Sequence, residues 1–198
     1  MRYFLDTEFI EDGKTIDLIS IAIVADDGRE YYACNDECRL ASASDWVKEN
    51  VLPSLPPKFA YAAVHPSPNA IRDSLAWKSR QRIKEDLLLF FAGGEIEPLK
   101  DQSLDSEAYK TVEPWAYYAD YDWVALCQLF GTMMDLPKGF PMYCRDIKQW
   151  CDQLGNPKLP EQGKGEHNAL ADARWNKQAW DYLNSLQAQK AVSSCAHP

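Results

Sequence analysis

The stretch of the chain that most restricts its fold is residues 18–24, LISIAIV, in which one serine interrupts β-branched and other apolar side chains. Such a run predicts a strand near the centre of a sheet. Residues 2–9 before it alternate in polarity and are rich in aromatics, and residues 30–34 follow it beyond a turn signal at residues 26–28, DDG. We therefore expect an antiparallel meander of three strands to open the domain.

Helix signals and one further strand, at residues 115–118, occupy the rest of the chain. Ser44 or Asp45 is suited to capping a short helix. Strands followed by alternating helix and strand predict an α/β fold with a mixed sheet flanked by helices. Apolar periodicity, caps and terminating glycines predict further helices over residues 79–91, 121–130, 146–154 and 168–187.

The length of 198 residues suits one domain, which we place at residues 1–190, with a C-terminal tail at residues 191–198. No apolar run reaches the roughly 18 residues that a membrane-spanning helix needs. The N-terminus also lacks the apolar stretch and small-residue cleavage site of a signal peptide. These features predict a cytoplasmic protein with no membrane partner.

The net charge of −9 restricts the kind of nucleic-acid partner. A protein that grips many phosphates is usually basic, so the charge argues against a protein that coats long duplexes. It is compatible with a site that holds only the last few nucleotides of a strand. Acidic clusters can be metal sites, so part of the negative charge can serve to bind cations instead of repelling nucleic acid.

Two carboxylates interrupt the first apolar strand. Because strand side chains alternate between faces, Asp6 and Glu8 point the same way, about 7 Å apart along the strand. Carboxylates so placed can share a pair of divalent ions, which lie about 4 Å apart in two-metal sites. The alternative is an edge strand whose acids face solvent, and Asp105 and Glu107 have the same spacing in a polar stretch.

Three residues later in the chain are further candidates. Asp122 follows a predicted strand and opens a helix, where α/β folds collect sites, although a helix N-cap is the simpler interpretation. Asp172 falls near the start of the last helix, and His167 lies just before it at the end of a flexible loop. A histidine there can accept a proton near neutral pH. The simpler alternative is a surface histidine beside a helix.

Together these residues resemble the DEDDh exonucleases, also called the DnaQ-like or RNase T-like superfamily. Its pattern is Asp-x-Glu on the first strand, an aspartate opening a middle helix, and His-x4-Asp near the C-terminus. All five positions are filled in order, by Asp6, Glu8, Asp122, His167 and Asp172.

Longer segments are similar to the ribonuclease AS group of actinobacteria and their phages. They are residues 1–13, 27–33, 79–83 with 86–87, and 121–129, and the resemblance extends to about residue 187, interrupted by extra sequence near residues 58–72. The superfamily implies an RNase H-like sheet, two Mg²⁺ or Mn²⁺ ions, a histidine general base and release of 5′-mononucleotides. The ribonuclease AS group implies a homodimer and RNA with adenylate-rich 3′ ends.

On this resemblance Asp6, Glu8, Asp122 and Asp172 are the expected metal ligands, and His167 is the expected base for the attacking water. Hard divalent cations prefer oxygen ligands, which fits the four carboxylates. The predicted activity is a 3′-5′ exoribonuclease acting on single-stranded 3′ ends.

Three residues beside the carboxylates are candidates for holding the substrate end. Phe9 offers a ring on which the last base can stack, with a contribution of about 1–3 kcal/mol, although a core position is an equal alternative. Backbone groups of Thr7 and Glu8 are expected to meet the terminal 3′-hydroxyl, as in similar enzymes. The basic and aromatic segment from Trp77 to Arg82 is a weaker candidate for guiding the strand and is read more simply as a solvated helix face.

Two other functions stay open on the sequence. The same five residues would serve a 3′-5′ exodeoxyribonuclease acting on DNA ends. A nucleic-acid-binding module that keeps the fold without catalysis is a more remote alternative, because every catalytic position is filled.

Overall fold

Six strands form one mixed sheet in the computed structural model, which describes residues 1–58, 64, 67, 69, 73–93, 109–163 and 165–195. The spatial order is β4-β3-β2-β1-β5-β6. The pairs β1–β2 and β2–β3 are antiparallel, whereas β3–β4, β1–β5 and β5–β6 are parallel. The strands are β1 (Arg2–Glu11), β2 (Ile16–Ala25), β3 (Glu30–Asn35), β4 (Trp77–Lys78), β5 (Glu113–Ala116) and β6 (Arg145–Asp146).

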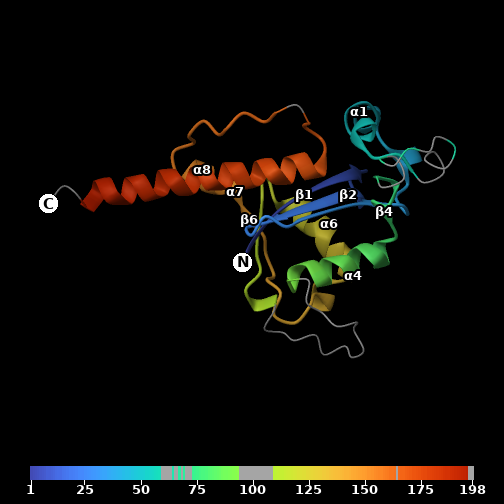
Figure 1. Cartoon of the computed structure of the whole chain (residues 1–198), viewed down its shortest axis with the longest axis horizontal. Coiled ribbons are helices and arrows are strands. Elements are labelled where there is room, and N and C mark those ends of the chain that lie inside the picture. The colour runs from blue at the N-terminus through green and yellow to red at the C-terminus, as the bar shows by residue number, and fades with distance from the viewer. Residues whose placement is uncertain are drawn as a thin grey trace.

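Helices cover both faces of the sheet, so the predicted α/β fold with a mixed sheet is confirmed (Figure 1). Helices α7 and α8 lie on one face and α4 and α6 on the other. The α-helices are α1 (Asp45–Asn50), α4 (Arg80–Phe91), α6 (Asp120–Phe130), α7 (Ile147–Gln153) and α8 (Ala169–Cys195), and the 3-10 helices are η1 (Leu40–Ser42), η2 (Leu52–Ser54) and η3 (Met133–Asp135).

The alternation of side chains along the central strands explains the two layers. On β1, Tyr3 and Leu5 pack with α4 and α6, while Phe4 between them packs with α7 and α8. On β2, Ile21 and Ile23 face the first layer in the same way. The central position predicted for residues 18–24 is therefore confirmed, since β2 is buried on both faces.

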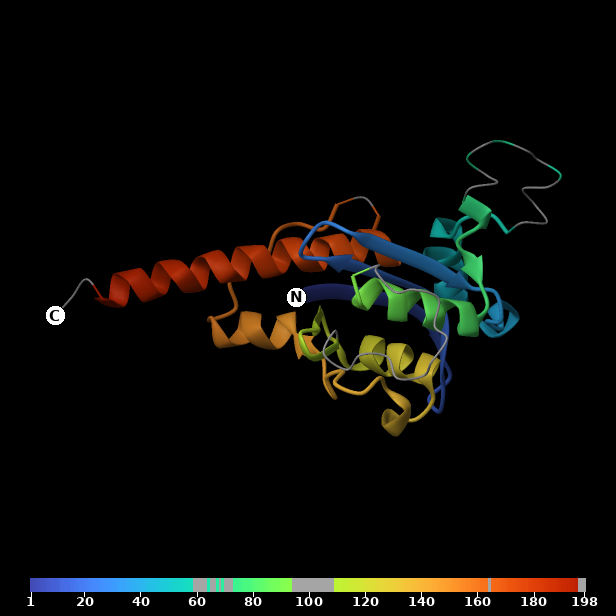
Figure 2. The ribbon, with the colours of Figure 1, turned by 60° about the horizontal axis from the view of Figure 1, so that its bottom comes forward.

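Helix α1 lies at one end of the sheet, on the side where β1 ends (Figure 2). Ser44 caps it by accepting a hydrogen bond from the backbone N–H of Val47 at 3.3 Å. Val47 and Val51 pack against Ile10 and Ile19 of the first two strands. This small apolar cluster holds α1 next to the carboxyl end of β1.

Two predicted element boundaries were wrong. Strand β5 ends at Ala116 instead of residue 118, because the chain turns through Tyr118, at a positive φ of 56°, to begin α6 at Asp120. Helix α8 continues to Cys195 instead of ending near residue 187, since the segment contains good helix formers and neither glycine nor proline. It extends beyond the body of the domain (Figures 1 and 2).

The short strands β4 and β6 have no signal in the sequence, because two residues cannot show a period. The extra sequence near residues 58–72 falls mostly outside the described residues, as do Asp105 and Glu107. Among the helices that are described, none is both long and apolar enough to cross a bilayer.

Candidate active site

Three carboxylates from two elements converge above the sheet face covered by α8. Asp6 and Glu8 project from β1, and Asp172 lies in the first turn of α8. One oxygen from each carboxylate lies within 4.8 Å of the others. Asp172 and Glu8 are only 8% and 9% exposed, so their charges are largely removed from water. In the order of strands β1 lies between β2 and β5, and Glu8 is buried, so these acids do not line a solvent-facing edge of the sheet.

Asp122, on α6, approaches the edge of β1 that faces β5. The pairing of β1 with β5 covers only Arg2 to Phe4, which leaves the backbone of Thr7 without a strand partner on that side. The Asp122 carboxylate takes this place, and its Oδ1 accepts hydrogen bonds from Thr7 N at 2.8 Å and Thr7 Oγ1 at 2.6 Å. Asp122 is 5% exposed and does not cap its own helix, whose N-cap is Ala119.

Asp172 is held in place by the loop that precedes its helix. Its Oδ2 accepts a hydrogen bond from the backbone N–H of His167 at 2.9 Å, and its Oδ1 accepts one from Gln162 Nε2. Asn168 caps the start of α8, since its side chain accepts a hydrogen bond from Ala171 N at 3.2 Å. Gln162 was not among the predicted site residues, because a glutamine in a proline- and lysine-rich loop carries no recognisable motif.

Burial raises the pKa values of all four carboxyl groups, and the charges of other members of the cluster add to the rise for Asp6, Glu8 and Asp122. Burial is the largest cause for Asp6, whose pKa is raised well above its usual value, with further contributions from Asp122, Asp172 and Glu8. The pKa of Glu8 rises to about 8 through burial and then the charges of Asp172 and Asp122. Burial raises the pKa of Asp122 to about 7 although the bonds from Thr7 lower it, and burial also raises the pKa of Asp172.

These shifts test whether the residues fit a metal. Four ionised carboxylates at a site partly removed from solvent repel one another unless protons or cations neutralise them. Oxygen ligands in this number and spacing match what Mg²⁺ and Mn²⁺ take. The donor set therefore fits hard divalent cations held by Asp6, Glu8 and Asp172, with Asp122 beside them.

The backbone of His167 lies directly beside the carboxylates, because its N–H donates to Asp172. Its φ of 67° is in the left-handed region, and its carbonyl oxygen accepts a hydrogen bond from Ser54 Oγ at 2.8 Å. The imidazole packs edge-to-face on Trp46 of α1, with ring centroids 4.8 Å apart. The sequence predicted the position of this histidine but neither Ser54 nor Trp46, which are more than a hundred residues away in the chain.

Phe9 follows Glu8 at the point where the register between β1 and β2 shifts. It is partly exposed and stacks on Tyr121 of α6, with centroids 5.6 Å apart and an interplanar angle of 16°. Tyr121 is 49% exposed, so this aromatic pair faces solvent next to Asp122 instead of filling the core. Tyr121 was not predicted, because its pairing with Phe9 depends on the tertiary fold.

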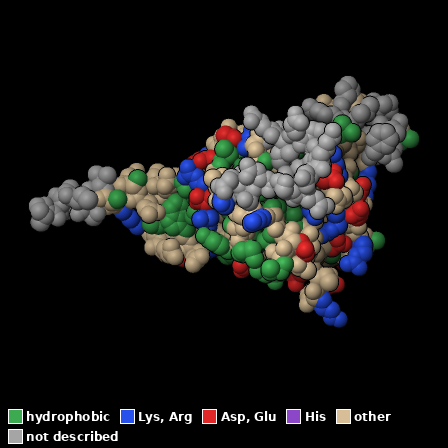
Figure 3. All heavy atoms as spheres, turned by 90° about the horizontal axis from the view of Figure 1, so that it is seen from below, with side chains coloured by type: hydrophobic (Ala, Val, Ile, Leu, Met, Phe, Trp, Pro, Cys, Tyr) green, Lys and Arg blue, Asp and Glu red, His purple; other side chains and the backbone are tan. Residues whose placement is uncertain are grey.

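The basic segment on the other face of the sheet is engaged in structural contacts. Lys78 and Arg82 both pair with Asp86, at 2.6 and 2.9 Å, and Arg80 donates to the carbonyl of Gln128. Figure 3 shows this side of the molecule, where Lys and Arg side chains are interspersed with acidic and hydrophobic ones. The simpler interpretation, a solvated helix face, accounts for these residues.

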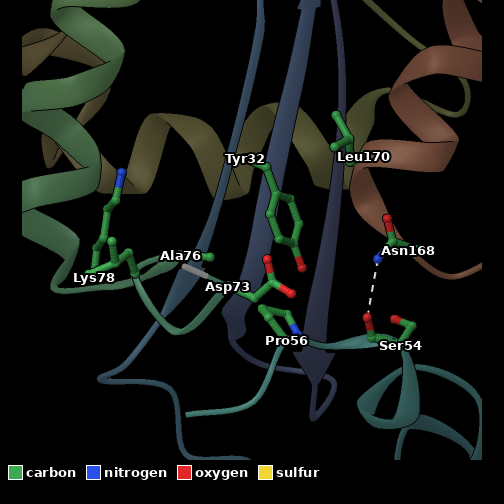
Figure 4. Close-up of a pocket in the computed structure, with 9 residues that line it drawn as sticks. Tyr32, Ser54, Pro56, Asp73, Ala76, Lys78, Asn168 and Leu170 are labelled. Atoms are coloured by element: carbon green, nitrogen blue, oxygen red, sulfur yellow. Dashed lines mark hydrogen bonds between the residues drawn. The ribbon is translucent and has the colours of Figure 1, made fainter. Parts of the chain in front are cut away.

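A cavity of about 490 Å³ opens beside the start of α8 (Figure 4). Tyr32 points into it from β3, and Ser54 and Asn168 lie on the side toward α8, joined by a hydrogen bond of 3.3 Å. Its lining residues are Tyr32, Ser54, Pro56, Asp73, Leu75, Ala76, Lys78, Asn168 and Leu170. The cavity thus borders the segment that carries His167.

Comparison with known proteins gives two findings. Residues 58–184 match a family model described as a 3′-5′ exoribonuclease Rv2179c-like domain. Two curated proteins of Mycobacterium tuberculosis, 3′-5′ exoribonuclease MT2234.1 from strain CDC 1551 / Oshkosh and 3′-5′ exoribonuclease Rv2179c from strain H37Rv, are each 42% identical over 174 residues. Each alignment covers 88% of this chain and 88% of the relative.

Proposed function

The chain belongs to the family of Rv2179c-like 3′-5′ exoribonuclease domains, and from this premise we propose that it removes 5′-mononucleotides from single-stranded 3′ ends of RNA as a metal-dependent DEDDh enzyme. The observation that carries the proposal is the convergence of Asp6, Glu8 and Asp172 to within 4.8 Å, with Asp122 and His167 adjoining. Bringing four carboxylates together at buried or partly buried positions costs stability until protons or cations neutralise them.

In the proposed reaction, Asp6, Glu8, Asp122 and Asp172 hold two Mg²⁺ or Mn²⁺ ions. When bound, such ions activate a water nucleophile and stabilise the leaving oxygen in an in-line displacement. His167 accepts the proton of the attacking water, a contribution of about 10²–10⁴-fold. Its backbone bond to Asp172 couples the position of this base to that of a proposed metal ligand.

The 3′ end of the RNA is proposed to lie against β1. Phe9 and Tyr121 offer a solvent-facing aromatic pair on which the last base can stack. Thr7 donates its N–H to Asp122, and the remaining backbone groups of Thr7 and Glu8 are proposed to meet the terminal 3′-hydroxyl. We also propose, from the resemblance to the ribonuclease AS group, a homodimer and a preference for adenylate-rich RNA.

Degradation of matched oligonucleotides tests the activity. We expect a time course on 5′-labelled poly(A) and mixed-sequence RNA to give products shortened one nucleotide at a time in Mg²⁺ or Mn²⁺. No product should form in EDTA, and single-stranded DNA of the same sequence should be degraded more slowly. Faster degradation of DNA would favour the exodeoxyribonuclease, and binding without product in either metal would favour a non-catalytic module.

Thermal unfolding at different pH tests the metal site without any substrate. In the folded protein the pKa of Glu8 is about 8, against 4.5 for the free group, and that of Asp122 is about 7, against 3.8. Between these values the folded state keeps protons that the unfolded state has lost, so the free energy of unfolding falls as pH rises. We therefore expect the Tm in EDTA to fall from about pH 5 to pH 8.

Added Mg²⁺ is expected to reverse this trend, because cations bind the deprotonated carboxylates. The rise in Tm that Mg²⁺ produces should be larger at pH 8 than at pH 5. A Mg²⁺ effect that is equal at both pH values, or a Tm in EDTA that rises over this range, would contradict the proposed ligand set.

A further inference from the structure

Trp46 is an exposed tryptophan with a specific neighbour. Its side chain lies on α1 and the residue is 54% exposed, which is unusual for so large an apolar group. Its ring meets the imidazole of His167 edge-to-face, with centroids 4.8 Å apart and an interplanar angle of 77°. Aromatic pairs prefer this geometry, and it contributes up to about a tenfold change in an equilibrium constant.

The backbone of His167 is held from two directions. Its left-handed φ of 67° is uncommon for a residue with a side chain and persists only where neighbours impose it. The N–H donates to Asp172, and the carbonyl oxygen accepts from Ser54 Oγ at the end of η2. Asn168 Nδ2 donates to the carbonyl of the same serine, the bond drawn in Figure 4.

The imidazole itself lacks such an anchor. Within the parts of the chain that are described, no side chain or backbone group forms a hydrogen bond with the His167 ring, and Trp46 is its ring contact. The loop before it contains Gly163 and Gly165, and glycine allows the backbone a wide range of conformations. By contrast, Trp46 stands on a capped helix whose Val47 and Val51 are buried in an apolar cluster.

We propose that Trp46 is a positioning residue, which acts through His167 by fixing the orientation of its imidazole. The inference rests on the proposed function, in which His167 accepts a proton. Misplacing a catalytic group by about 1 Å can cost about 10²-fold in rate, so a contact that selects one ring orientation has a measurable effect. Trp46 is assigned no contact with RNA, in contrast to Phe9 and Tyr121.

A double-mutant cycle tests this assignment. In Mg²⁺ with single-stranded RNA, Trp46→Ala is expected to lower kcat about tenfold with KM changed less than about threefold, and Trp46→Phe should restore most of the loss. In a His167→Ala background, adding Trp46→Ala should change kcat less than about twofold, because the group it positions is gone. Glu49→Ala, an exposed change on the same helix, is the matched control and should be silent.

A magnetic resonance measurement supplies a readout besides activity. The His167 ring signal, identified by its loss in His167→Ala, should shift in metal-free Trp46→Ala because the ring current of tryptophan is removed. It should not shift in Glu49→Ala.

Three results would overturn the assignment. They are an unchanged kcat or His167 signal in Trp46→Ala, an equal loss of kcat with and without His167, and a rise in KM alone, which would indicate direct contact with RNA. Absence of turnover in the unmodified protein would instead overturn the proposed function, and the first assay detects that separately.

Discussion

Replacing Glu8 by glutamine is expected to lower kcat/KM on single-stranded RNA by about 10³-fold or more. The carboxylate lies within 4.8 Å of those of Asp6 and Asp172, so its removal takes one of the proposed ligands out of the centre. Metal ions contribute several kcal/mol of transition-state stabilisation, and each 1.36 kcal/mol is a factor of about ten in rate. Steady-state kinetics with saturating Mg²⁺ measure the loss.

The same substitution is expected to raise stability when metal is absent. Burial and the charges of Asp172 and Asp122 raise the pKa of Glu8 to about 8, so its ionised form is disfavoured in the folded state. Glutamine has nearly the same shape and no charge, and the Tm in EDTA at pH 8 should therefore increase by a few degrees, at about 2–4 °C for each kcal/mol. The stabilisation should shrink toward pH 5, where Glu8 is protonated.

Glu11→Gln is the matched control, because Glu11 lies on the same strand, is exposed and lies outside the cluster. It should change neither turnover nor Tm measurably. A Glu8→Gln protein that keeps more than about a tenth of its turnover, or that is less stable in EDTA at pH 8, would contradict the assignment of Glu8 as a ligand in a repulsive cluster.

Replacing His167 by alanine is expected to lower kcat by about 10²–10⁴-fold, the usual contribution of a general base. The fold should remain, since the residue lies in a loop at the surface of the site and its backbone bonds to Asp172 and Ser54 do not need the imidazole. Single-turnover kinetics, together with the Tm, separate the loss of proton transfer from a loss of structure.

The left-handed backbone at His167 calls for a second variant. Alanine tolerates a φ of 67° poorly, whereas asparagine adopts this region more readily and also lacks a basic ring. His167→Asn should therefore lose as much kcat as His167→Ala with a smaller change in Tm. Glu161→Ala, a change at an exposed residue of the same loop, controls for loop effects. Full turnover in both His167 variants would show that another group accepts the proton.

Much of the candidate site could be predicted because its signals are local. The period of two in a strand places Asp6 and Glu8 on one face, and the order of strands and helices predicts a mixed sheet. Position alone made Asp122, His167 and Asp172 weaker candidates, which the resemblance then favoured, and the structure places each of them beside the first pair. Judged singly, Asp122 read as a helix cap and His167 as a surface residue.

Supporting residues could not be found in this way. The backbone of Thr7 was a candidate for contact with the 3′-hydroxyl, but nothing in the sequence indicated that Thr7 donates two hydrogen bonds to Asp122, 115 residues later in the chain. Gln162, Trp46 and Tyr121 likewise belong to no motif, and each gains its contact from a different element. Their types are too common at the surface of soluble proteins to mark a site.

The amino-acid sequence by itself determined the local geometry: which segments are strands, which faces are apolar, and that two acids share a face of the first strand. These features depend on periods of a few residues. The tertiary structure alone decided that α6 fills the gap where β5 stops pairing with β1, and that α1 stands beside the histidine loop. Such contacts join residues far apart in the chain, so they depend on packing, and no short-range pattern encodes them.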